Sequence, residues 1–159
     1  MSGVVVWFTG LPSSGKTTLA AKVAAALQQR HSVVLLDGDD VRAALRPEPG
    51  YSEEERDAFY ETLARLAALI AEQGQVVLVP ATAHLRFFRE RARTLAPAFL
   101  EVFVDTPLEE CVRRDSKGLY ALGGPEVPGV GVPFEPPESA EVVVRPGDEG
   151  VEAVVSRLG

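Results

Sequence analysis

Residues 10–17 read Gly-Leu-Pro-Ser-Ser-Gly-Lys-Thr, which matches the complete pattern G-x-x-x-x-G-K-T. An apolar run, Val4–Thr9, precedes this stretch, and a helix-forming run over residues 16–30 follows it. A strand, a glycine-rich loop and a helix in this order form a P-loop, because the backbone N–H groups of the loop and the helix N-terminus together cradle phosphates. The alternative is a glycine turn that binds nothing, but the matching flanks favour a nucleotide site.

The predicted nucleotide site divides its tasks among the residues of this loop. Lys16 is expected to reach the β- and γ-phosphates of ATP, and the Thr17 hydroxyl to coordinate the Mg²⁺ that bridges them. Thr18 is a further candidate for phosphate contact. The ATP-binding residues that the motif predicts are Gly10, Leu11, Pro12, Ser13, Ser14, Gly15, Lys16, Thr17 and Thr18.

The composition predicts one cytosolic domain spanning residues 1–159. A chain of 159 residues is long enough for one ordinary core and too short for two. Its net charge of −7 argues against a nucleic-acid partner, because affinity for a phosphate backbone needs clustered Lys and Arg. No basic segment opens the chain, and no apolar run approaches the ~18 residues of a membrane span. The single cysteine, Cys111, is expected to be a buried helix residue rather than a nucleophile.

Strand-like and helix-like segments alternate along the chain, which is typical of a parallel sheet covered on both faces. Apolar runs predict strands at residues 4–9, 33–36, 76–79, 99–104 and 141–144. Helices are expected at residues 16–30, 53–73, 86–95, 107–114 and 150–158. The second run ends at Asp37-Gly38-Asp39-Asp40, so these carboxylates are expected at the same sheet edge as the P-loop.

Residues 123–137 contain nine Gly or Pro residues and show neither helical nor alternating periodicity. A loop of this length inside a compact domain is usually a lid, a binding loop or a disordered segment. We expect a lid over the nucleotide, spanning residues 116–140.

Several motifs together resemble the adenylylsulfate kinase family. Besides the P-loop they are L-D-G-D-D-V-R at residues 36–42, G-Y-S at 50–52 with Arg56, E-V-F-V-D-T-P-L-E-E-C at 101–111, R-D-S-K-G-L-Y at 114–120 and F-E-P-P-E at 134–138. The resemblance covers nearly the whole chain. It implies a three-layer α/β P-loop kinase fold, with a five-stranded parallel sheet in the order 2-3-1-4-5.

The resemblance also implies an activity, the phosphorylation of the 3′-hydroxyl of adenosine 5′-phosphosulfate by ATP with Mg²⁺. The catalytic residues it implies are Lys16, Asp39 and Lys117. Asp39 would orient or deprotonate the acceptor hydroxyl, and Asp37 would join Thr17 at the metal. Plainer interpretations remain open, in which Asp37 caps the following helix and Asp39 pairs with Arg42 on the surface.

The acceptor-binding residues that the resemblance implies are Asp37, Asp39, Arg42, Tyr51, Arg56 and Lys117. Arg42 and Arg56 would grip the phosphosulfate, because a planar guanidinium binds oxygens bidentately, and Tyr51 would stack on the adenine. Either arginine could instead be a solvated helix charge, and Tyr51 a hydrophobic staple. Arg114 would contact the donor ATP. Lys117 would close onto phosphates or the acceptor, or else be a cation at a helix C-terminus.

Departures from the family's pattern lie where the acceptor should bind. Residues 58–62 read Ala-Phe-Tyr-Glu-Thr where the family has E-N-I-R-R, and residues 81–86 read Ala-Thr-Ala-His-Leu-Arg where it has F-I-S-P-Y-R. Ala83 stands at the family's serine and has no hydroxyl, so no phosphoenzyme can form there. His31 and His84 match no motif and are expected to be surface or packing residues.

The leading hypothesis is an adenylylsulfate kinase that transfers a phosphoryl group directly and in line. The alternatives are a kinase for another small hydroxyl-bearing metabolite, since one scaffold serves many acceptors, and an ATP-binding regulatory module without turnover. The expected partners are the small-molecule substrates ATP and adenylylsulfate, with no nucleic acid and no membrane. A homodimer is kept as the candidate assembly.

Overall fold

Five parallel strands form the central sheet of the computed structural model, which describes residues 2–122 and 127–159. The strands are β1 (Val4–Thr9), β2 (Val33–Leu35), β3 (Val76–Pro80), β4 (Phe99–Val104) and β5 (Val142–Val144). Their spatial order is β2-β3-β1-β4-β5, so the predicted order is confirmed. The central strand β1 pairs Val4 with Val76 of β3 and Val5 with Phe99 of β4.

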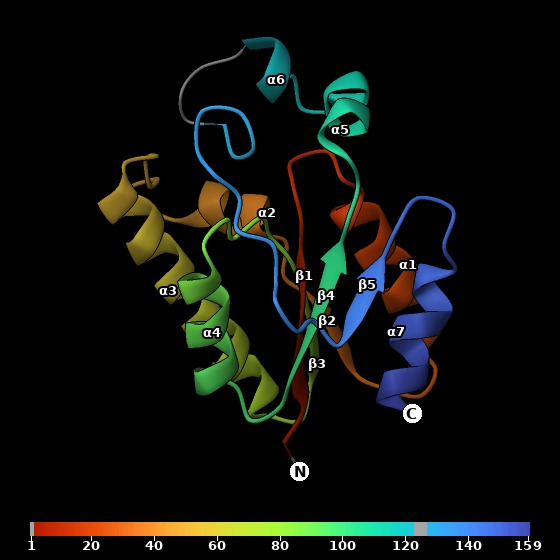
Figure 1. The fold of residues 1–159 in the computed structure, drawn as a ribbon. Coiled ribbons are helices and arrows are strands. Elements are labelled where there is room, and N and C mark those ends of the chain that lie inside the picture. The colour runs from red at the N-terminus through yellow and green to blue at the C-terminus, as the bar shows by residue number, and fades with distance from the viewer. Residues whose placement is uncertain (1, 123–126) are drawn as a thin grey trace.

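Helices cover both faces of this sheet (Figure 1). One face carries α3 (Glu53–Ala71) and α4 (Arg86–Leu95), and the other carries α1 (Lys16–Leu27) and α7 (Gly150–Leu158). Successive residues of β1 alternate between the two layers, because side chains along a strand point to opposite faces. Val5 and Trp7 belong to the core under α3 and α4, whereas Val6 and Phe8 belong to the core under α1 and α7. Burial on both faces explains the continuous apolar runs of the strands.

The carboxyl ends of the strands point towards three short helices, α2 (Gly38–Ala44), α5 (Leu108–Arg114) and α6 (Leu119–Leu122) (Figure 1). Both chain termini lie at the opposite edge of the sheet. The P-loop and the segment after β2 therefore share one edge, as predicted, and this is the edge at which open α/β sheets bind ligands. Within the described residues, no helix combines the length and the apolar character needed to cross a bilayer.

The structure corrects several boundaries. The helix expected over residues 16–30 ends at Leu27, and α2 and α6 were not predicted as separate elements. Of the loop expected at residues 123–137, residues 123–126 lie outside the described residues. The rest is not structureless, because Pro128 and Val132 form a β-bridge. Its far end is anchored, since the Glu135 N–H donates to the His84 carbonyl oxygen at 2.7 Å.

Candidate active site

The P-loop joins β1 to α1 through two residues with left-handed backbone. Ser13 has a φ of 62°, and Gly15, the N-cap of α1, has a φ of 104°. A Cβ atom at Gly10 would lie 2.6 Å from the carbonyl oxygen of Val104, so glycine permits the close approach of the loop to β4. In the described part of the chain, no side chain caps α1 and no acid occupies its first turn. The helix N–H groups and the positive end of its dipole are thus left for an anion.

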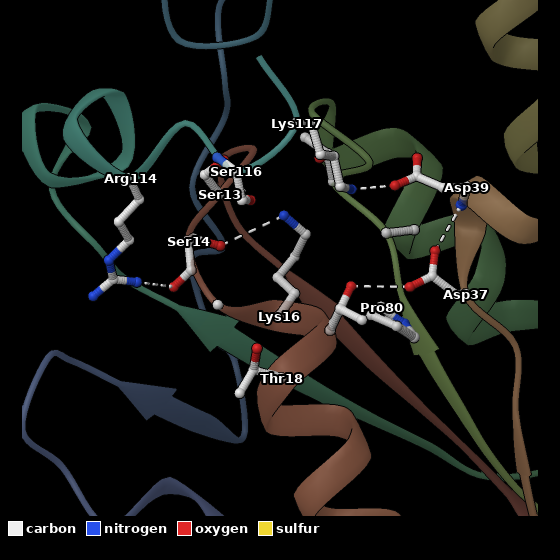
Figure 2. Close-up of a pocket in the computed structure, with 14 residues that line it drawn as sticks. Ser13, Ser14, Lys16, Thr18, Asp37, Asp39, Pro80, Arg114, Ser116 and Lys117 are labelled. Atoms are coloured by element: carbon white, nitrogen blue, oxygen red, sulfur yellow. Dashed lines mark hydrogen bonds and ion pairs between the residues drawn. The ribbon is translucent and has the colours of Figure 1, made fainter. Parts of the chain in front are cut away.

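Lys16 is buried inside the P-loop (Figure 2). Its Nζ donates to the carbonyl oxygens of Gly10 at 2.9 Å and Leu11 at 2.7 Å, and it lies 3.5 Å from Ser14 Oγ. Burial, followed by the charge of Lys117, lowers the pKa of Lys16 to about 7. A phosphate beside Nζ would favour the charged ammonium and oppose this shift.

A cavity of about 340 Å³, the donor cavity, opens beside the loop (Figure 2). Thr17 Oγ1 donates to Asp37 Oδ2 at 2.9 Å, so the two predicted metal ligands lie together in its wall. Asp37 Oδ1 accepts the Asp39 N–H at 2.8 Å and caps α2, which confirms the capping interpretation without removing the contact to Thr17. The lining residues are residues 13–18, Asp37, Asp39, Pro80, Ala81, Thr82, Arg114, Ser116 and Lys117.

A second cavity of about 330 Å³, the acceptor cavity, adjoins the first. It brings together the predicted residues Asp39, Arg42, Tyr51, Arg56 and Lys117, and Pro12 of the P-loop also lines it. Leu11 instead lines a separate hollow beside residues 129–136. Of the predicted acceptor set, Asp37 alone lies only in the donor cavity.

Arg42 is enclosed rather than solvated. Its guanidinium carbon lies 4.5 Å from the ring centre of Tyr51 and 4.3 Å from that of Phe59, and Nη1 donates to the carbonyl oxygens of Pro49 and Gly50 at 3.0 Å each. Arg56 is buried as well, with its guanidinium carbon 5.5 Å from the centre of the Tyr51 ring. The interpretation of either arginine as a solvated charge is therefore wrong. Tyr51 lies just before α3 and packs against its first turn, as a hydrophobic staple would. Its partner there is the cationic side chain of Arg56 rather than an apolar one.

Asp39 and Lys117 line both cavities. Their side chains form an ion pair between α2 and the connection from α5 to α6 (Figure 2). The interpretation in which Asp39 pairs with Arg42 on the surface is therefore wrong. Arg114 lies on the other side of the P-loop, where Nη1 donates to the Ser14 carbonyl oxygen at 3.2 Å. It lines the donor cavity and a further hollow of about 380 Å³ that reaches the start of α7.

Residues from the end of β3 to His84 form part of the site, although the sequence assigned no site role to them beyond placing residues 81–86 near the acceptor. Pro80, Ala81 and Thr82 line the donor cavity, and His84 lines the acceptor cavity together with Tyr60 of α3. Their place after a parallel strand was the available signal, because it puts them at the ligand edge. His84 packs edge-on against Phe88, as a packing residue was expected to do, and burial lowers its pKa to about 4. Cys111 is buried as predicted, and burial raises its pKa.

Comparisons with known proteins agree with this geometry. A sequence model of the family described as adenylylsulphate kinase matches residues 2–145. An adenylyl-sulfate kinase of Synechococcus sp. (strain JA-3-3Ab) is 42% identical over 158 residues, which cover 96% of this chain and 90% of that protein. The structure of the Mycobacterium tuberculosis APS kinase CysC in complex with AMPPNP and APS matches with a TM-score of 0.88 at 36% identity, covering 98% of this chain and 95% of that one.

Some relatives are much longer than this chain. The bifunctional enzyme NodQ of Azospirillum brasilense is 41% identical over 161 residues, which cover 97% of this chain. This chain spans only 26% of the length of that protein. The similarity therefore concerns one part of NodQ.

Proposed function

The chain belongs to the adenylylsulfate kinase family, and from that premise we propose that it transfers the γ-phosphoryl group of MgATP to the 3′-hydroxyl of adenosine 5′-phosphosulfate. The observation that carries the proposal is the meeting of the donor and acceptor cavities at Asp39 and Lys117. A transfer between two bound substrates requires such a shared boundary, because the reacting oxygen and phosphorus must lie in contact.

The donor side supplies the phosphate contacts. The loop N–H groups, the helix N-terminus and Lys16 hold the nucleotide phosphates, and Arg114 adds a cation on the far side of the loop. The Thr17 hydroxyl and the Asp37 carboxylate are hard oxygen donors of the kind that Mg²⁺ prefers. Mg²⁺ bound there would neutralise charge on the phosphates. Among the described residues no group of three or more His, Cys, Asp or Glu gathers as a metal site, which fits an ion held mainly by substrate and water.

The acceptor side supplies orientation and a proton acceptor. Arg42 and Arg56 give the cavity its positive charge, and the half-exposed ring of Tyr51 offers a face for a purine. Asp39 orients the acceptor hydroxyl and accepts its proton as the oxygen attacks phosphorus. Lys117 stabilises the charge that develops on the transferred group.

Adenylylsulfate should bind weakly for this family. Residues 58–62 and 81–86 differ from the family's pattern around the acceptor, and each lost hydrogen bond is worth roughly 0.5–1.5 kcal/mol. Several such losses would raise KM by about one to three orders of magnitude, because each ~1.4 kcal/mol is a factor of ten. We therefore expect the rate of 3′-phosphorylation to approach saturation only at high concentrations of adenylylsulfate.

The test is ADP release from MgATP with adenylylsulfate, gluconate, shikimate or nucleosides, measured against a blank without acceptor. Adenylylsulfate should give ADP above the blank and a product carrying a 3′-phosphate. If millimolar adenylylsulfate gives none while another hydroxyl compound does, the enzyme is a kinase with a different acceptor. If no acceptor gives turnover although ATP binds, the chain is a nucleotide-binding module.

A further inference from the structure

Residues 82–84, called the turn below, lie between β3 and α4 at the border of the two cavities. Ala81 and Thr82 line both cavities, and His84 lines the acceptor cavity. Between them, Ala83 is fully buried and has a φ of 43°, in the left-handed region that residues with a Cβ rarely adopt. Such a conformation persists only where the surroundings fix it. The contacts that hold this turn therefore set the shape of the boundary.

Tyr60 holds the turn from the acceptor side. Its hydroxyl accepts the buried Ala83 N–H at 3.1 Å, and its ring stacks on Phe88 with 4.7 Å between the ring centres. Tyr60 lies on α3 beside Phe59 and one helical turn after Arg56, and all three line the acceptor cavity. One hydroxyl thus connects the acceptor-lining helix to the turn.

Thr9 and Arg89 hold the turn from its other sides. Thr9 Oγ1 donates to the Thr82 carbonyl oxygen at 2.6 Å, and Arg89 Nη1 donates to the Ala83 carbonyl oxygen at 2.6 Å. Thr9 is the last residue of β1, directly before the P-loop. One hydroxyl therefore ties the turn to the end of β1, next to the P-loop, and another ties it to α3.

We propose that Tyr60 is a positioning residue of the acceptor site. Its hydroxyl fixes the turn at residues 82–84, and the turn sets the distance and angle at which the acceptor hydroxyl meets the transferred phosphoryl group. This inference rests on the proposed function, because it presupposes transfer between the two cavities. Displacement of a reacting group by 1 Å can lower a rate by about 10²-fold. Loss of one hydrogen bond that fixes this boundary is therefore expected to lower the rate of transfer.

The test is Tyr60→Phe, which keeps the ring and removes the hydroxyl. We expect kcat/KM for adenylylsulfate to fall by about 10- to 100-fold, with the loss appearing in the acceptor KM and in kcat. The Kd of MgATP, measured by calorimetry, should change by less than about twofold, because Tyr60 does not line the donor cavity. The matched control is Val154→Ala, which removes buried volume from the opposite core layer. It should lower Tm and leave the acceptor KM unchanged.

The outcomes separate this inference from the proposed function. If Tyr60→Phe lowers Tm but keeps the wild-type acceptor kinetics, Tyr60 only packs and the inference is wrong; an equal loss of ATP affinity also overturns it. If the wild-type protein uses another acceptor, the substrate assignment fails and the same comparison with that acceptor decides the role of Tyr60. If Tyr60→Phe does not fold, Thr9→Val releases the turn from the other side, and an unchanged acceptor KM in that variant overturns the inference.

Discussion

Lys117 and Asp39 form an ion pair on the boundary of the donor and acceptor cavities, although 78 positions separate them in the sequence. Their side chains are 47% and 61% exposed. A pair this accessible to water contributes at most about 1 kcal/mol, so substrates can separate it easily. In the mechanism proposed above, Asp39 would exchange the Lys117 ammonium for the acceptor hydroxyl.

Asp39→Asn should abolish most turnover while ATP still binds. The amide cannot accept the acceptor proton, so kcat should fall by about 10²-fold or more, which is the usual contribution of a general base. Lys16→Ala should instead weaken stabilisation on the donor side. The control is Asp40→Asn, the same change at an exposed neighbour that lines neither cavity. Steady-state rates and ATP binding measure both effects, and wild-type turnover in Asp39→Asn would remove Asp39 from the mechanism.

Nucleotide binding should take up a proton at about pH 8. Burial lowers the pKa of Lys16 to about 7, so most free protein carries a neutral amine at that pH. Phosphates beside Nζ raise the pKa again, and the amine gains a proton from the buffer, whereas ATP phosphates, with a pKa near 6, are already ionised. Calorimetry in buffers of different ionisation enthalpy measures the uptake.

Two comparisons check this proton uptake. It should diminish at about pH 6, where the free Lys16 is already charged. Lys16→Arg should show none at either pH, because a guanidinium stays charged. A binding enthalpy at pH 8 that is the same in every buffer contradicts the prediction.

His84→Gln should flatten the acid side of the stability profile. Burial lowers the pKa of His84 to about 4, whereas an unfolded histidine titrates near 6.5. The unfolded chain therefore binds more protons between these values, and the free energy of unfolding falls as the pH drops from about 6.5 to about 4. Urea unfolding at pH 7, 6 and 5 measures this slope. His31→Gln, a change at the only other histidine of the chain, serves as the comparison variant, and an equal slope in His84→Gln would show that other groups cause it.

Chymotrypsin should cut the lid region after Leu122 and spare Phe134. Leu122 is 85% exposed, whereas the Phe134 ring stacks on Phe103 with 6.0 Å between the ring centres. MgADP with adenylylsulfate should slow the cut, because Leu122 borders the acceptor cavity and a bound substrate would restrict the access of the protease to it. Phe103→Ala is the matched variant and should expose a second cut at Phe134. Mass spectrometry follows the cleavage. Equal cleavage rates with and without ligands would show that this segment is an ordinary surface loop.

Local sequence patterns predicted most of the fold. Val4–Thr9, Phe99–Val104 and Arg86–Leu95 agree with their predicted bounds, because a strong apolar or amphipathic run ends at a clear breaker in each case. The helix α2 was missed as an element, since seven residues are too few to display a periodic apolar stripe.

From the sequence, the site was predictable only for residues that belong to a recognisable motif. The P-loop residues and Asp37 with Thr17 follow from a local pattern and from strand ends. Tyr60 lies in residues 58–62, which the resemblance places near the acceptor, but the sequence assigns no role to its side chain. Its role depends on the contact with Ala83, 23 residues away, which no periodicity reports. The Asp39–Lys117 pair likewise needs the tertiary structure.

The two cavities share only some of their lining residues, and this has a consequence for evolution. The residues Arg42, Tyr51, Arg56, Phe59, Tyr60 and His84 border the acceptor cavity and not the donor cavity. Under the proposed function, substitutions there would change which hydroxyl compound enters without altering how ATP is held. Changes at Asp39 or Lys117 alter both sites at once. The scaffold can thus acquire new acceptors through one wall of one cavity, and a mutant library confined to those six positions would explore acceptor range in variants that still bind ATP.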